Sequence, residues 1–256
     1  MTKQLADLKQ WFLNYSSSFI HSHPQLKEPL QLKQDHSLRV AQIAKSLALE
    51  LSFSEENVLL STAAGLIHDS GRFQQYCTYG TFMDKRSVNH AKLGVEILKN
   101  SQALLSFPSD AQEKLLKAVT YHNRATLPQN DNELCLPKIL RDADKIDIWK
   151  IVIDYFHNPS EKQKKAIELD LSSEDTYSTD IAQAIMDQTV SRVKSLRFVN
   201  DFKLLTVGWV YDINFSCSFR TIKEKQYIEK LQNLLPKDKT IESVFRGAID
   251  HVQKMS

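Results

Sequence analysis

The chain has few of the residues that break or link secondary structure. Its 256 residues include only 6 glycines and 7 prolines, fewer than average usage gives for this length. Because a fold of many short strands needs many tight turns, this scarcity argues against an all-β protein. The 42% hydrophobic content suffices for the core of a globular protein. The composition therefore favours helices, in keeping with the all-α fold that we expect from the whole sequence.

Cysteine is scarce as well. The three cysteines, Cys77, Cys135 and Cys217, are an odd number and lie far apart. Without a paired spacing they indicate reduced, buried or incidental thiols instead of a disulfide framework.

The chain also lacks a strong excess of charge and a long apolar run. Its 33 basic and 31 acidic side chains leave a net charge of +2, too small for the overall field to attract polyanions. No apolar stretch approaches the about 20 residues of a membrane span, and the first ten residues lack the apolar segment of a signal peptide. We therefore expect a soluble, cytoplasmic protein with no nucleic-acid partner and no membrane partner.

Apolar residues recur at helical spacing through the first half of the chain. From Leu38 onward this periodicity predicts an amphipathic helix with His36 in its first turn. A second helix is expected to begin near Ser54, as N-cap, and to end at Gly71, as a left-handed C-cap. The segment 72–86 has no sustained period and is expected to be a loop that crosses the site.

Two further helices are expected before residue 123. Ser87 is a candidate N-cap for a helix with His90 in its first turn. Ser109 and Gln112 resemble a capping box for a helix that ends at His122.

A long helix is then expected to begin at Pro137 and to carry Asp144. Leu140, Asp144 and Ile148 share one face of this helix, so the carboxylate projects from an apolar ridge. A buried carboxylate in such a place favours a cation as its partner.

The second half of the chain is less clearly patterned. A charged stretch at 161–165 is expected to be a solvated connection, helices are expected around 181–202 and 222–235, and 204–219 stays ambiguous. We expect residues 1–160 to form a helical metal-binding core and residues 161–256 a helical extension packed on that core. An arrangement in two lobes is the alternative.

Four residues stand out as metal ligands: His36, the adjacent pair His68 and Asp69, and Asp144. Imidazole nitrogens and carboxylate oxygens in one shell suit a divalent transition metal, whose open positions would hold the water used for hydrolysis. A lone histidine is more often an ordinary interior residue, but the four together indicate a site.

The order His36, His68-Asp69, Asp144 resembles the H…HD…D pattern of the HD superfamily of metal-dependent phosphohydrolases, over roughly residues 30 to 155. The resemblance implies the HD-domain helical fold, here with a helical C-terminal extension. It also implies that the four positions hold a divalent ion (Mn, Fe, Co, Ni, Zn or Mg) and that Asp69 is the catalytic residue.

His90 and His122 stand where two-metal members of the superfamily place extra ligands. We expect a second ion there, bridged to the first by Asp69, so that the chain holds one or two ions. The alternative is that both histidines bind substrate phosphate or act as acids from the cleft wall.

Two cations lie close to the ligands in sequence, Arg72 and Lys145. Both are candidates for binding substrate phosphate. The alternatives are an arginine that complements a helix dipole and a solvated lysine. In a regular helix Lys145 points about 100° away from Asp144.

The segment 72–86 offers two further sets of side chains. A solvated face is favoured over a substrate lid for the polar set Gln74, Gln75, Asp84, Lys85, Arg86 and Asn89. Stacking on a base and anchoring of the segment to the core stay open for the aromatic set Phe73, Tyr76, Tyr79 and Phe82.

The expected function is hydrolysis of a phosphate ester by metal-activated water, with a nucleotide or related phosphorylated metabolite as substrate. One alternative is a cyclic or dinucleotide phosphodiesterase, and another is a non-catalytic nucleotide-binding regulatory HD module. The expected partner is this small phosphorylated molecule; assembly into a homo-oligomer stays open.

Overall fold

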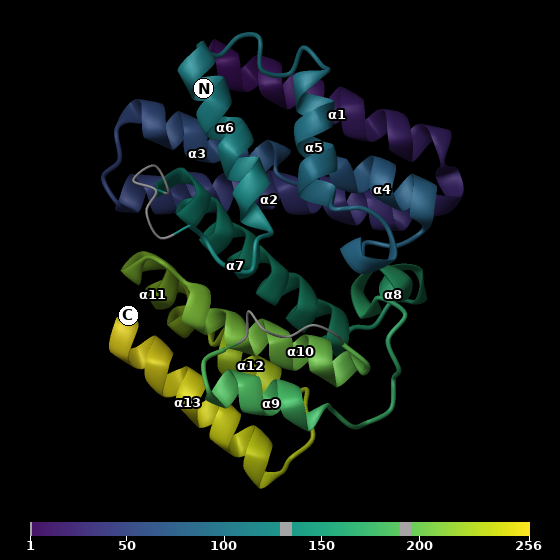
Figure 1. Cartoon of the computed structure of the whole chain (residues 1–256), viewed down its shortest axis with the longest axis vertical. Coiled ribbons are helices and arrows are strands. Elements are labelled where there is room, and N and C mark those ends of the chain that lie inside the picture. The colour runs from purple at the N-terminus through teal and green to yellow at the C-terminus, as the bar shows by residue number, and fades with distance from the viewer. Residues whose placement is uncertain (1, 129–134, 190–195) are drawn as a thin grey trace. The chain divides into compact units, whose positions relative to one another are not determined.

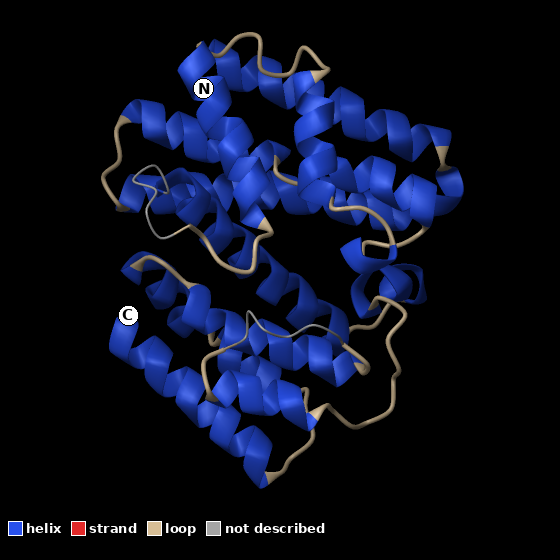
Figure 2. Cartoon of the chain, viewed as in Figure 1, coloured by secondary structure: helices blue, strands red, loops and turns tan. Residues whose placement is uncertain are grey.

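The computed structural model describes residues 2–128, 135–189 and 196–256. Within these ranges the regular secondary structure is helical, with no strand and one isolated bridge between Ser172 and Phe198 (Figure 2). The predicted all-α fold is therefore confirmed. None of the described helices is both long and apolar enough to cross a membrane.

The chain divides into two compact units, Met1–Asp144 and Lys145–Ser256. The division falls inside the long helix α7 (Cys135–His157), ahead of the boundary expected at residue 160. The assignment of residues 161–256 as an extension of one common core stays a prediction.

The first unit contains the helices that carry the candidate ligands (Figure 1). Before α7 these are α1 (Lys3–Ser22), η1 (Pro24–Leu26), α2 (Lys27–Glu50), α3 (Glu55–Ile67), α4 (Gly71–Tyr79), η2 (Asp84–Arg86), α5 (His90–Lys99) and α6 (Ser109–His122). Helix α2 packs along α3, α1 packs against α2, α3 and α4, and α6 packs against α3 and α5. Fully buried side chains such as Phe12, Leu30, Ile67 and Leu115 fill the core between them.

A glycine allows α2 and α3 to approach closely. A Cβ added to Gly65 would lie 2.7 Å from Ala41 Cα, too short for any side chain. The two backbones therefore touch, which brings His36 on α2 beside His68 at the end of α3, with ring centroids 5.2 Å apart.

Helix α2 begins well before the start expected near Leu38. It runs from Lys27, so that His36 lies in its interior and not in its first turn. The polar residues on either side of Leu32, at 31 and 33–35, hid the period, although Leu30 is fully buried. Pro29 does not interrupt the helix because a proline in the first turn removes no intrahelical hydrogen bond.

The expected left-handed C-cap at Gly71 is wrong. Gly71 is the first residue of α4, and Gly80, with φ 66°, is the one glycine with positive φ among the described residues. A Cβ on Gly71 would lie 2.2 Å from the carbonyl oxygen of His90. This glycine is therefore needed for close contact between α4 and α5 instead of for a left-handed turn.

The segment 72–86 is mostly helical, contrary to the expected loop. It consists of most of α4, a short connection and η2. Phe73 and Tyr76, three residues apart, are buried on one face of α4. A helix of nine residues is too short for this spacing to be recognised as a helical period in the sequence.

Two expected caps also differ in the structure. Asn89, and not Ser87, caps α5, since its side chain accepts a hydrogen bond from the Lys92 amide. Ser109 lies inside α6, and Gln112 donates to the Phe107 carbonyl instead of completing a capping box.

The second unit is also helical. After the end of α7 it contains α8 (Glu161–Glu168), α9 (Thr179–Met186), α10 (Val199–Gly208), η4 (Trp209–Asp212), α11 (Ser216–Lys225), α12 (Tyr227–Gln232) and α13 (Lys239–Met255). Helix α13 packs against α9, α10, α11 and α12. The ambiguous stretch 204–219 is thus largely helical, and the connection expected at 161–165 is instead part of α8. Of the helix expected over 181–202, residues 190–195 lie outside the described residues.

Candidate metal centre

The first group of predicted ligands lies together in the first unit. Asp144 Oδ1 is 3.0 Å from His36 Nε2 and 3.6 Å from His68 Nε2. Asp69 Oδ2 is 3.6 Å from each of the same two nitrogens. We call these four residues the first cluster; they come from α2, from the turn after α3 and from α7.

The second group uses the other oxygen of the same aspartate. Asp69 Oδ1 is 3.4 Å from His90 Nε2 and 3.7 Å from His122 Nε2. His90 begins α5 and His122 ends α6. These three residues form the second cluster, and Asp69 therefore has the position of a carboxylate that bridges two sites.

The orientation of two rings is fixed by the backbone. His68 Nδ1 lies 2.8 Å from the Gly65 carbonyl oxygen, and His122 Nδ1 lies 2.7 Å from the Val119 carbonyl oxygen. Because a carbonyl only accepts, each Nδ1 carries the hydrogen, and in the neutral ring Nε2 keeps a lone pair. Among the described residues, the buried Nε2 of His68 has no hydrogen-bond partner. A cation is the partner that such a nitrogen lacks.

His90 is oriented by a carboxylate. Its Nδ1 lies 2.8 Å from both oxygens of Asp84, so that it donates to them and Nε2 is left with a lone pair. Burial lowers the pKa of His90 to about 3, and Arg72 adds to this effect. The ring is therefore neutral at pH 7 and suited to be a ligand.

Both cluster carboxylates are ionised. Burial would raise the pKa of Asp69, but Lys33, His68 and Arg72 hold it well below its usual range. Burial would likewise raise the pKa of Asp144, but the His36 and His68 rings hold it well below its usual range. Anionic carboxylate oxygens and imidazole nitrogens form a donor set that suits a divalent transition metal.

Asp84, for which the sequence favoured a solvated face, contacts the second cluster through His90. Besides His90, it accepts hydrogen bonds from Arg72, Gln75 and Asn123. Burial would raise its pKa, but the His90 hydrogen bond and Arg72 lower it to about 2. The solvated face expected here is thus wrong for Asp84, whose carboxylate orients the His90 ring.

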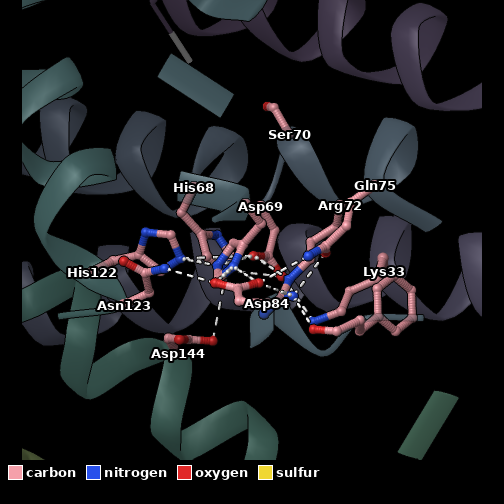
Figure 3. A network of polar contacts seen from close by, with 12 residues as sticks. Lys33, His68, Asp69, Ser70, Arg72, Gln75, Asp84, His122, Asn123 and Asp144 are labelled. Atoms are coloured by element: carbon pink, nitrogen blue, oxygen red, sulfur yellow. Dashed lines mark hydrogen bonds and ion pairs between the residues drawn. The ribbon is translucent and has the colours of Figure 1, made fainter. Parts of the chain in front are cut away.

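Two cations lie beside Asp69, as Figure 3 shows. Arg72 Nε is 3.4 Å from Asp69 Oδ1, so this arginine lies beside the candidate ligands, as its place in the sequence suggested. Lys33 Nζ is 2.8 Å from Asp69 Oδ2. Lys33 was missed because α2 was expected to begin after it; once the helix is known, Lys33 and His36 share a face.

The other predicted cation, Lys145, has a different partner. Its ammonium lies 2.6 Å from Asp212 Oδ2 in the second unit. Its role in binding substrate phosphate stays a prediction.

Arg141 supports the end of the helix that carries His122. Its guanidinium donates to the carbonyl oxygens of Tyr121, His122 and Arg124. These acceptors are at the C-terminus of α6, where helix carbonyls lack partners within the helix. Arg141 therefore links the α7 segment that carries Asp144 to the second cluster.

The aromatic residues of segment 72–86 are mostly internal. Phe73, Tyr76 and Phe82 are buried, whereas Tyr79 is 48% exposed. This burial favours the anchoring of the segment over base stacking for these three side chains.

Comparison with known families agrees with this geometry. Residues 34–149 match the family model of the HD domain. This match is consistent with an HD domain in the first half of the chain. Such domains are generally metal-dependent hydrolases of the phosphohydrolase superfamily, so the predicted resemblance is confirmed. Two groups of described residues are compatible with a divalent metal ion: His36, His68 and Asp69, and Asp69, His90 and His122. Neither a curated protein nor a solved structure matches the chain.

Proposed function

We propose that this HD domain is a phosphohydrolase that uses two divalent ions sharing Asp69. The observation that carries the proposal is the orientation of three imidazole rings around that carboxylate. His68, His90 and His122 each direct Nδ1 to an acceptor, which leaves Nε2 of each ring facing Asp69. Lone pairs and an anion gathered in a buried space favour cations between them.

The residues divide naturally between two ions. His36, His68, Asp69 and Asp144 would hold the first, and Asp69, His90 and His122 would hold the second. The ions supply Lewis acidity, which polarises a phosphoryl group and activates water for attack on phosphorus. Asp69 is the catalytic residue in this proposal because it is common to both sites.

Arg72 supplies a fixed positive charge at the edge of the centre. Its guanidinium donates to the Phe82 carbonyl and to Asp84, and it pairs with Asp69. A guanidinium held in this way is pre-oriented for phosphate oxygens. The proposed substrate is the phosphate ester of a nucleotide or of a related phosphorylated metabolite.

The second cluster also favours another candidate, a phosphodiesterase that acts on a cyclic or dinucleotide. Two ions side by side can stabilise both the attacking and the leaving oxygen of a phosphodiester. A regulatory module that binds metal and nucleotide without turnover is the non-enzymatic alternative.

A phosphate-release screen tests the proposal. The purified protein is assayed with Mn²⁺, Co²⁺, Ni²⁺ or Mg²⁺ against nucleoside mono-, di- and triphosphates and sugar phosphates. Cyclic nucleotides and dinucleotides are followed by chromatography, because their cleavage releases no free phosphate. We expect metal-dependent turnover of at least one class.

The matched variants are Asp69→Asn and, as control, Asp110→Asn on the exposed side of α6. Asp69→Asn is expected to reduce turnover at least about 100-fold, as for loss of a metal ligand, and Asp110→Asn to leave it unchanged. A protein that binds no metal, or an active Asp69→Asn variant, would overturn the proposal. Metal binding without turnover of any substrate would favour the regulatory module.

A further inference from the structure

Lys33 is the cation in shortest contact with the shared carboxylate. Its ammonium is 2.8 Å from Asp69 Oδ2, and its side chain is only 16% exposed. It lies on α2 one helical turn before His36. A lysine held this deeply by one carboxylate is part of the centre and not a surface residue.

The oxygen that Lys33 contacts also belongs to the first cluster. Asp69 Oδ2 lies 3.6 Å from His36 Nε2 and 3.6 Å from His68 Nε2. A divalent ion held by this cluster needs the same oxygen, and it would repel the ammonium. Lys33 and an ion in the first cluster therefore compete for one carboxylate oxygen.

Lys33 has a second support that does not involve Asp69. Its ammonium lies 5.3 Å from the centroid of the Phe82 ring, and the Arg72 guanidinium lies 5.8 Å from the same centroid. Cations at such distances from a ring are attracted by its face. Phe82 thus holds both cations beside the cluster, where an anionic ligand of the ions would meet them.

We propose that Lys33 exchanges partners: it releases Asp69 when a divalent ion binds Oδ2 and then pairs with the phosphoryl group of the substrate. The inference rests on the proposed phosphohydrolase function and assigns a new phosphate-binding residue to it. It predicts effects of opposite sign, because loss of the lysine charge removes a competitor of the ion and a partner of the phosphate.

The test compares Lys33→Met with Lys45→Met. Methionine keeps much of the lysine stem without its charge, and Lys45 is an exposed lysine of the same helix, about 18 Å from Lys33 along the axis. Mn²⁺ is titrated calorimetrically into metal-free protein, and inorganic phosphate is then titrated into the Mn²⁺-loaded protein. Lys33→Gln is measured in parallel as a second neutral variant, and Lys33→Arg as a variant that keeps the charge.

In both neutral Lys33 variants we expect Mn²⁺ to bind about tenfold more tightly and phosphate about tenfold more weakly, as for one unit charge in a partly solvated site. Lys33→Arg should bind phosphate nearly as well as the original protein, and Lys45→Met should change neither affinity. If neutral variants weaken Mn²⁺ binding, or leave phosphate binding unchanged, the exchange is refuted. If the unsubstituted protein binds no Mn²⁺, the proposed function itself fails.

Discussion

His90 and His122 face each other across the second cluster with their Nε2 atoms 3.0 Å apart. On the far side of each ring, Nδ1 makes a hydrogen bond: that of His90 to Asp84 and that of His122 to the Val119 carbonyl oxygen. Two lone pairs cannot form a hydrogen bond with each other. A cation shared by the two rings and Asp69 removes this conflict, and the first two predictions concern that cation.

His122→Ala should remove one ion. The protein is expected to hold about two ions per chain, as two-metal hydrolytic centres do, and the variant about one. Elemental analysis after metal loading and gel filtration measures the ratio. His21→Ala, at an exposed position of α1, is the control and should keep both ions; equal metal content in the two variants would contradict the second cluster.

Asp84→Asn should weaken the second ion selectively. The amide can no longer accept from His90 as an anion, so the ring becomes less basic and less fixed. Loss of such a carboxylate typically lowers metal affinity about 10–100-fold. Calorimetric titration should show this loss for one of two binding events. An equal loss in both would indicate a general structural defect instead of a role in positioning His90.

Gly71→Ala should be strongly destabilising. The new Cβ would lie 2.2 Å from the His90 carbonyl oxygen, and separation of α4 from α5 should cost about 3 kcal/mol in the free energy of unfolding, as severe overpacking does. Urea denaturation measures this free energy.

Gly247→Ala is the matched control for that substitution. At this position on α13 the added Cβ would make an ordinary contact, 3.5 Å from the Tyr211 hydroxyl. The variant should gain up to about 1 kcal/mol from helix propensity. Similar stabilities for the two variants would show that α4 and α5 are not packed as described.

Tyr15→Phe tests the support of Asp69 from α1. The Tyr15 hydroxyl donates to the Ser70 carbonyl at 3.0 Å, one residue after Asp69. Phenylalanine keeps the ring contact with Phe73 and removes only this bond, so unfolding should become easier by about 1 kcal/mol. The same change at exposed Tyr79 is the control, and an identical melting temperature for both variants would argue against the contact.

The candidate ligands could be selected from the sequence for physical reasons. The proposed metal role restricts the residue types at His36, His68, Asp69 and Asp144, and helical periodicity places them on three separate elements. Their order along the chain then carries most of the information. That order resembles the H…HD…D pattern, and the resemblance implied the helical HD-domain fold.

The residues around the ligands lacked such constraints. The position of Lys33 on α2 follows only once the helix is known to begin at Lys27. The polar residues before His36 concealed that start in the sequence. Asp84 meets His90 through an irregular segment, where no periodicity relates sequence to position. Gly71 was compatible with both a left-handed cap and a close backbone contact, and only the approach of α5 decides between them.

The most direct measurement is anomalous diffraction from crystals of the protein loaded with Mn²⁺. The account predicts two anomalous peaks about 3.5 to 4 Å apart, the usual spacing of two-metal centres. One peak should lie between Asp69 Oδ2, His36, His68 and Asp144, and the other between Asp69 Oδ1, His90 and His122. A single peak in the first cluster, or none beside Asp69, would contradict a two-ion centre bridged by this residue.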